Sequence, residues 1–211
     1  MAMQIAILLF DGLTPLDAVG PYQVLRELPG AGVAFVAADP GPKSTEGRSF
    51  ALVADHALHA VPRPDIVLVP GGSGELDART DERVIDWLRT ADETSQWTTS
   101  VCTGALLLGA AGLLEGKRAT THWTALEALR QFGAVPVGDE RVVFDGKLVT
   151  AAGVSAGIDM ALTLAAEIAG DEVAQEIQLE IEYDPQPPFD TGSVQKAPAA
   201  LVERRRAASR F

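Results

Sequence analysis

The fold is decided by residues 97–114, which have the sequence WTTSVCTGALLLGAAGLL. The first five residues are rich in β-branched side chains and predict a short strand. The residues from 105 onward are almost entirely apolar and predict a buried helix. Only Cys102-Thr103-Gly104 lie between the two elements, and Gly104 supplies backbone freedom for a sharp turn. The stretch therefore predicts a strand that passes directly into a helix, with a cysteine at the junction.

Strands and helices alternate along the rest of the chain as well. The apolar and β-rich runs predict strands at 4–10, 33–37 and 65–69, and a hairpin at 141–150. The helical patterns cover 14–28, 81–91, 125–132, 158–168 and 172–183. Strands that alternate with helices indicate βαβ units. We therefore expect an α/β fold with a mostly parallel central sheet.

The length and composition allow one large domain. The chain has 211 residues, and 47% of them are hydrophobic. We expect a single domain over residues 1–198, followed by a basic tail at 199–211. The prolines of residues 184–189 exclude a helix there and predict an extended arm that packs on this subunit or on a neighbour. The arginines at 204–206 predict a solvated helix end within the tail.

The charge of the chain argues against two classes of partner. The net charge is −12, and an acidic surface repels the phosphates of nucleic acid and of anionic membranes. No apolar run approaches the roughly 20 residues that span a bilayer. Residues 1–10 lack the basic start of a secretory signal. We therefore expect a cytoplasmic protein that acts on a small molecule.

Cys102 is the single cysteine of the chain, which excludes an internal disulfide and a site of several cysteines on a metal. Three roles are open for it: a buried apolar filler, a bridge between chains or a reactive thiol. A helix N-terminus stabilises a thiolate through its free N–H groups and its dipole. Ligands of open α/β sheets also bind at the carboxyl ends of the strands, where Cys102 lies. This position favours a nucleophile.

Two further segments are expected at the same edge of the sheet. The loop at 70–74 is rich in glycine and follows a strand, so its N–H groups can approach a substrate closely. Asp17 lies early in the helix after the first strand. Its carboxylate either offsets the helix dipole or serves as a general acid and base beside Cys102.

Taken together, these segments resemble the ThiJ/PfpI superfamily. The matching pieces are Leu9 to Gly12, Asp17, Val69 to Gly72, Val101 to Ala105 and Ala119 to Trp123. Within the superfamily, Asp17, the pair Cys102-Thr103 and the late segment from Ile181 to Phe189 are most similar to the isocyanide hydratase branch. The resemblance implies a flavodoxin-like three-layer sandwich of the glutamine-amidotransferase type, and a homodimer.

The resemblance also implies a role for each site residue. Cys102 is the nucleophile, and Asp17 is its acid and base partner. The backbone N–H groups of Gly72 and Thr103 form the pocket that stabilises developing negative charge. His122 either lines the site or caps the next helix. The implied reaction is the hydration of an isocyanide to an N-substituted formamide, with no metal and no organic cofactor.

Two other functions remain open. The first is another cysteine-dependent reaction on small electrophiles, such as hydration of methylglyoxal, although such relatives usually place glutamate and histidine around the cysteine. The second is a redox-sensing or ligand-sensing domain in which Cys102 is oxidised rather than turned over. A peptidase is less favoured, because Thr103 stands where the peptidase-like relatives have histidine.

Overall fold

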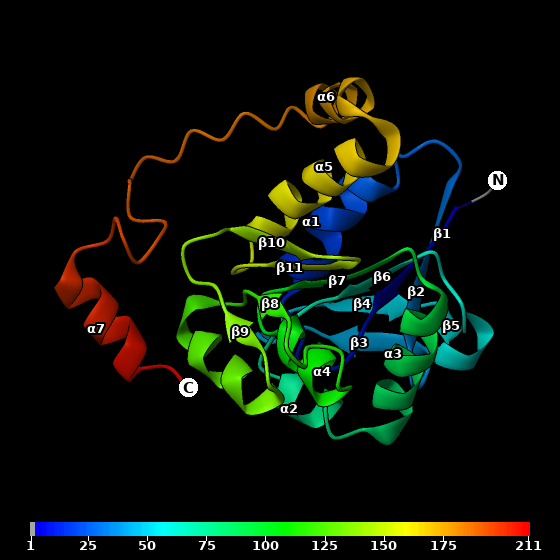
Figure 1. Ribbon diagram of the computed structural model, residues 1–211, viewed down its shortest axis with the longest axis horizontal. Coiled ribbons are helices and arrows are strands. Elements are labelled where there is room, and N and C mark those ends of the chain that lie inside the picture. Colours follow the sequence, from blue (N-terminus) through cyan, green and yellow to red (C-terminus); the bar gives the residue numbers. More distant parts are fainter. Residues whose placement is uncertain (1–2) are drawn as a thin grey trace.

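The computed structural model describes residues 3–211 and shows a central sheet between two layers of helices (Figure 1). The sheet has seven strands in the order β10-β11-β7-β6-β1-β2-β5. All neighbouring strands are parallel except β10 and β11. The strands of this sheet are β1 (Met3–Leu8), β2 (Ala31–Ala37), β5 (His56–Ala57), β6 (Ile66–Val69), β7 (Trp97–Val101), β10 (Val142–Asp145) and β11 (Leu148–Ala151). The predicted α/β three-layer fold with a mostly parallel sheet is confirmed.

The helices divide between the two faces of the sheet (Figure 1). One layer holds α1 (Pro15–Leu25), α5 (Ala156–Ala169) and α6 (Asp171–Glu180). The other layer holds α2 (Glu75–Ala78), α3 (Glu82–Thr94), α4 (Gly104–Ala110) and the 3-10 helix η2 (Trp123–Phe132). The strands between these layers are buried on both faces, which explains why β1 and β6 are continuous apolar runs.

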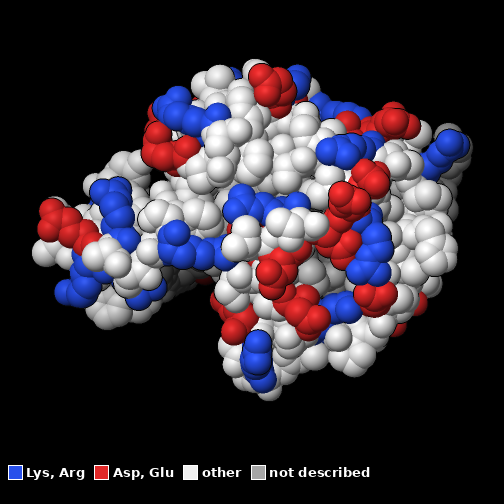
Figure 2. Space-filling model, turned by 90° about the horizontal axis from the view of Figure 1, so that it is seen from below, with Lys and Arg blue, Asp and Glu red and all other residues white. Residues whose placement is uncertain are grey.

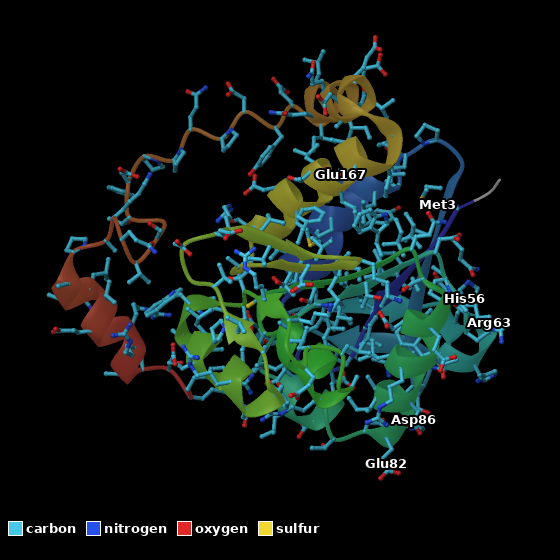
Figure 3. The ribbon with its side chains drawn as sticks, in the orientation of Figure 1. Met3, His56, Arg63, Glu82, Asp86 and Glu167 are labelled. Carbon is cyan, nitrogen blue, oxygen red and sulfur yellow. The ribbon has the colours of Figure 1, made fainter. Side chains whose placement is uncertain are left out.

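Helix α3 shows how the outer layer follows from the sequence. Glu82 and Asp86, four residues apart, point away from the sheet (Figure 3). Val84 and Leu88 lie on the opposite face and are buried in the core. The side chain of Asp81 accepts a hydrogen bond from the N–H of Arg83 and so caps the helix.

Several short elements differ from the prediction. Residues 39–48, where the sequence predicts neither helix nor strand, contain β3 (Gly41–Ser44), which pairs with β4 (Ala51–Ala54). The predicted helix at 125–132 is a 3-10 helix. Three further short elements are η1 (Leu58–Ala60), β8 (Arg118–Ala119) and β9 (Val135–Pro136). The strands β3, β4, β8 and β9 are two to four residues long, too short to show a hydrophobic period in the sequence.

The chain leaves the domain after α6. Residues 184–189 form neither helix nor strand, as their prolines predict. The chain then returns to the body as α7 (Ala199–Ala207), which lies beside the main domain (Figure 1). Between residues 3 and 211, no helix is both long enough and apolar enough to cross a bilayer.

Candidate active site

Parallel strands place the predicted site segments at one edge of the sheet. The strands β1, β6 and β7 are neighbours and run in the same direction, so their carboxyl ends meet. Cys102 directly follows β7, the loop at 70–74 follows β6, and α1, which carries Asp17, follows β1. The structure therefore brings together the residues that the sequence predicted separately.

Cys102 has a strained backbone at the turn between β7 and α4. Its φ of 56° lies in the left-handed region, which is uncommon for a residue other than glycine. The N–H of Cys102 donates to the carbonyl of Ala152 at 2.9 Å, and the hydroxyl of Thr121 donates to the carbonyl of Cys102 at 2.6 Å. A Cβ atom on Gly104 would lie 2.1 Å from the carbonyl oxygen of Val69. The turn is thus held by hydrogen bonds and by close backbone packing.

Asp17 lies completely buried beneath the turn. Its Oδ2 accepts a hydrogen bond from the N–H of Gly71 at 2.9 Å. Its Oδ1 has no hydrogen-bond partner of good geometry among residues 3–211, although the Cys102 thiol is close enough to lower the carboxyl pKa slightly. Burial dominates and raises the pKa of Asp17 from 3.8 to about 7. A proton is therefore available on this carboxyl near neutral pH.

Cys102 is also buried, and its protonation is tied to that of Asp17. Burial and the negative charge of Asp17 raise the pKa of the thiol to about 12. The N–H groups of Val154 and Thr103 act in the opposite direction. The helix start therefore favours the thiolate as the sequence predicted, but burial and Asp17 outweigh it. From about pH 7 upward the thiol and the carboxyl share one proton, which makes them a coupled pair.

The two predicted N–H donors lie where the loop after β6 meets the turn. The N–H of Gly72 donates to the hydroxyl oxygen of Thr103 at 3.0 Å. A Cβ atom on Gly71 would lie 2.5 Å from the nitrogen of Thr103, so only glycine permits this approach. Gly72 has a φ of 139°, which also favours glycine. In this structure the hydroxyl of Thr103 occupies the N–H of Gly72, and a substrate has to displace it to use that donor.

A cavity of about 320 Å³ opens above the thiol. Its lining includes Cys102, Thr103 and Gly72 from the predicted site. Ser73, beside Gly72, also lines it, and the remaining lining residues come from five other parts of the chain and are Thr14, Glu46, His122, Thr124, Val154, Arg205, Ser209, Arg210 and Phe211. Its volume lies near the lower end of the range for small-molecule sites.

Residues 3–167 match the model of the DJ-1/PfpI family. The chain belongs to this family. An isonitrile hydratase from Pseudomonas putida is 48% identical over 210 residues, which cover 99% of this chain and 91% of the relative. Among solved structures, a THiJ/PfpI family protein from Pseudomonas syringae has 37% identity and a TM-score of 0.95, and the match covers 99% of this chain and 86% of that one. Drosophila melanogaster DJ-1beta has 25% identity and a TM-score of 0.78, covering 88% of this chain and all of its own.

His122 has both of the roles that the sequence left open for it in this DJ-1/PfpI domain. Its Nδ1 lies 2.8 Å from the hydroxyl of Thr124 and accepts from the Thr124 N–H at 3.4 Å, so it caps η2. Its side chain also lines the cavity. Burial and the charge of Arg205 lower its pKa below the ordinary value of 6.5, so the ring is neutral at pH 7.

Two residues of the site in this member of the family act on the thiol in ways that the sequence did not predict. Glu46 lies between β3 and β4 and accepts a hydrogen bond from the hydroxyl of Thr14 at 3.1 Å. Its negative charge raises the pKa of both Asp17 and Cys102. Val154 has a φ of 40°, which is strained for a β-branched residue, and its N–H favours the thiolate. A signal for Val154 was available, because it follows β11, whose carboxyl end lies beside that of β7.

Proposed function

We propose that this protein is an isonitrile hydratase, which adds water to an isocyanide to give an N-substituted formamide. The observation that carries the proposal is the buried pair of the Cys102 thiol and the Asp17 carboxyl at the floor of a small cavity. The pair offers a nucleophile and a proton together, which an isocyanide carbon requires. The identity of 48% to a whole-length isonitrile hydratase supports the same reaction.

The first half of the reaction forms a covalent intermediate. The pair reacts as Cys102 thiolate and protonated Asp17. The sulfur attacks the terminal carbon of R–N≡C, and the proton of Asp17 moves to the same carbon. A C–S bond and a C–H bond form, giving the thioimidate R–N=CH–S–Cys102, and Asp17 is left as a carboxylate. We assign the stabilisation of the developing charge to the N–H of Thr103, which favours the thiolate, and to that of Gly72 once the Thr103 hydroxyl is displaced from it.

The second half releases the product. The Asp17 carboxylate takes a proton from water while the hydroxide adds to the thioimidate carbon, and that proton passes to the nitrogen. The tetrahedral adduct R–NH–CH(OH)–S–Cys102 then collapses. The C–S bond breaks, the hydroxyl proton returns to Asp17, and R–NH–CHO leaves. The pair regains its one shared proton, so the cycle needs only the isocyanide and water.

Formamide production by the purified protein, with Cys102→Ala as control, tests the proposal. We expect steady formation of formamide from a simple alkyl isocyanide and its loss to the uncatalysed rate in Cys102→Ala. Substantial hydration by Cys102→Ala contradicts covalent catalysis. Hydration of methylglyoxal in place of isocyanide, abolished by the same substitution, would instead support the glyoxalase-like alternative.

We further propose that the enzyme works as a homodimer in the cytoplasm. A reducing compartment keeps a catalytic thiol free, and Cys102 is a free cysteine. The cavity is suited to a small molecule, and the net charge of −12 disfavours nucleic acid as a partner.

A further inference from the structure

The end of the last thirteen residues forms part of the wall of the active-site cavity. We call residues 199–211 the C-terminal segment; it comprises α7 and the four residues after it. Arg205, Ser209, Arg210 and Phe211 of this segment line the same cavity as Cys102. Figure 2, seen from below, shows the segment as a lobe with many basic side chains and a deep hollow between it and the main body. The mechanism above uses none of these residues.

Arg210 fastens the segment to the loop that follows β6. Its guanidinium donates to the carbonyl of Ser73 at 2.9 Å and to the carbonyl of Gly72 at 3.0 Å. It also donates to Oε2 of Glu75 at 2.9 Å. The Arg210 side chain thus binds two carbonyl groups of the loop that carries the N–H of Gly72 and the carboxylate at the start of α2.

Glu75 makes this attachment specific. Its side chain is completely buried at the start of α2. Its Oε1 lies 3.1 Å from the guanidinium of Arg79 without making a hydrogen bond of good geometry, so Arg210 is its main directed partner among residues 3–211. A buried carboxylate is costly without a cation. The buried carboxylate of Glu75 is therefore a specific binding site for the guanidinium of Arg210.

Two aromatic contacts place the segment further. The guanidinium of Arg206 lies 5.7 Å from the centroid of the Trp123 ring, next to His122 in the cavity wall. The guanidinium of Arg210 lies 4.8 Å from the centroid of the Phe211 ring. Arg210 thus binds the loop and also contacts the ring of Phe211, which lines the cavity.

We propose that the C-terminal segment is the wall that selects substrates by size, and that Arg210 is the positioning residue that seats this wall through Glu75. The selection among isocyanides rests on the proposed function, whereas the position of the C-terminal segment beside Cys102 does not. With the wall seated, Phe211 limits the substituent that reaches Cys102. When Arg210 is lost, the segment loosens and bulky reagents reach the thiol.

Alkylation of Cys102 tests the wall without any turnover. We compare Arg210→Ala with Arg204→Ala, which removes the same charge from α7 but lies outside the cavity lining. We expect Arg210→Ala to raise the alkylation rate by a bulky N-aryl maleimide about tenfold more than the rate by iodoacetamide, and Arg204→Ala to change neither. Equal effects on both reagents, or equal effects of both variants, would overturn the proposal.

Substrate preference gives a second measure. In Arg210→Ala and in Phe211→Ala we expect the ratio of kcat/KM for a methyl isocyanide over a bulky aryl isocyanide to fall about tenfold. If neither the ratio of kcat/KM values nor the relative alkylation rates change, the proposal that the C-terminal segment selects by size is wrong. A protein that hydrates no isocyanide yet shows the alkylation difference refutes the proposed function and supports the wall.

Two further variants distinguish a displaced C-terminal segment from an unfolded protein. If Arg210→Ala leaves Glu75 unpaired and the protein unfolds, the double variant Arg210→Ala with Glu75→Gln removes both charges and restores folding, as circular dichroism reports. We expect that double variant to show the same loss of size selection. Arg210→Lys keeps the charge but not the three-way contact, and we expect it to recover only part of the selection. A folded double variant with wild-type selection would contradict the role of Arg210.

Discussion

At the residue scale, the site depends on two ionisable groups whose environments disfavour their charged forms. Burial raises the pKa of Asp17 to about 7 and that of Cys102 to about 12. Neither group alone suits nucleophilic catalysis at neutral pH. Together they hold one proton over a wide range of pH, and exchange of that proton between carboxyl and thiol produces the reactive thiolate.

The pH dependence of hydration follows from this pair. We expect kcat/KM to rise as the pH passes through about 7, because the doubly protonated pair then loses its first proton, and to stay level to pH 9. In Asp17→Asn the step near pH 7 is lost and kcat falls about 100-fold or more. Initial rates of formamide formation from pH 5 to pH 9 measure both. A wild-type profile with no step in this range would contradict the shared proton.

The same carboxyl makes stability depend on pH. The folded state keeps the Asp17 proton up to about pH 7, whereas the unfolded chain releases it near 3.8. Because the folded state then binds more protons, the free energy of unfolding falls as the pH rises between these values. From pH 5 to pH 8 we expect a loss on the order of 3 kcal/mol from this group, absent in Asp17→Asn. Urea unfolding of both proteins at the two pH values measures it, and equal losses would argue against a raised pKa.

At the scale of elements, the site is made by the junctions between strands and helices. The turn from β7 to α4 and the loop after β6 touch backbone to backbone, with Gly71 against Thr103 and Gly104 against Val69. The strained φ of Cys102 is tolerated because both flanking elements are fixed by the core. Placement of the thiol is therefore a property of two packed elements and not of the cysteine alone.

Gly104→Ala tests this packing. A Cβ atom there would meet the carbonyl oxygen of Val69 at 2.1 Å, which forces the turn away from β6. We expect a loss of about 3 kcal/mol in the free energy of unfolding, together with a loss of Cys102 reactivity. Gly192→Ala is the matched control, because nothing lies within 4 Å of its added carbon. Urea titration measures both variants, and similar stabilities would show that the turn relaxes freely.

At the scale of the whole molecule, the distant end of the chain completes the site. Arg210 contacts Gly72, which is 138 residues earlier in the sequence. The end of α6 and the connection from it to α7 leave two large apolar side chains in solvent, Leu179 in the helix and Phe189 in the connection. Exposed apolar groups of this size are typical of surfaces that meet a partner.

A homodimer is the expected assembly. We expect the protein to have a mass in solution of twice the 22.2 kDa of one chain, since pairing would cover part of this apolar surface. Light scattering coupled to size-exclusion chromatography measures that mass. Substitution of Phe189 by Ser weakens the dimer if this residue lies in the interface, with Phe50→Ser, an exposed ring after β3, as control. A monomeric wild-type protein would contradict the expectation.

The central layer of the fold and the core of the site could be predicted from the sequence because their signals are local. Apolar runs give the strands, the Cys102-Thr103-Gly104 turn gives the junction, and parallel topology then places Asp17 at the same edge. Short elements such as β3 and β8 were missed because strands of four and two residues are too short to show a hydrophobic period.

The sequence by itself therefore determined the α/β architecture, the candidate nucleophile and its candidate partner. Only the tertiary structure decided that the thiol has a raised pKa, because burial depends on all the surrounding elements. It also decided that Glu46 and Val154 belong to the site and that Arg210 pairs with Glu75. The solvated helix end predicted at residues 204–206 is confirmed, because these arginines are exposed in the last turn of α7. The contact of Arg210 could not be predicted, since charge along a sequence does not reveal a buried carboxylate elsewhere in the fold.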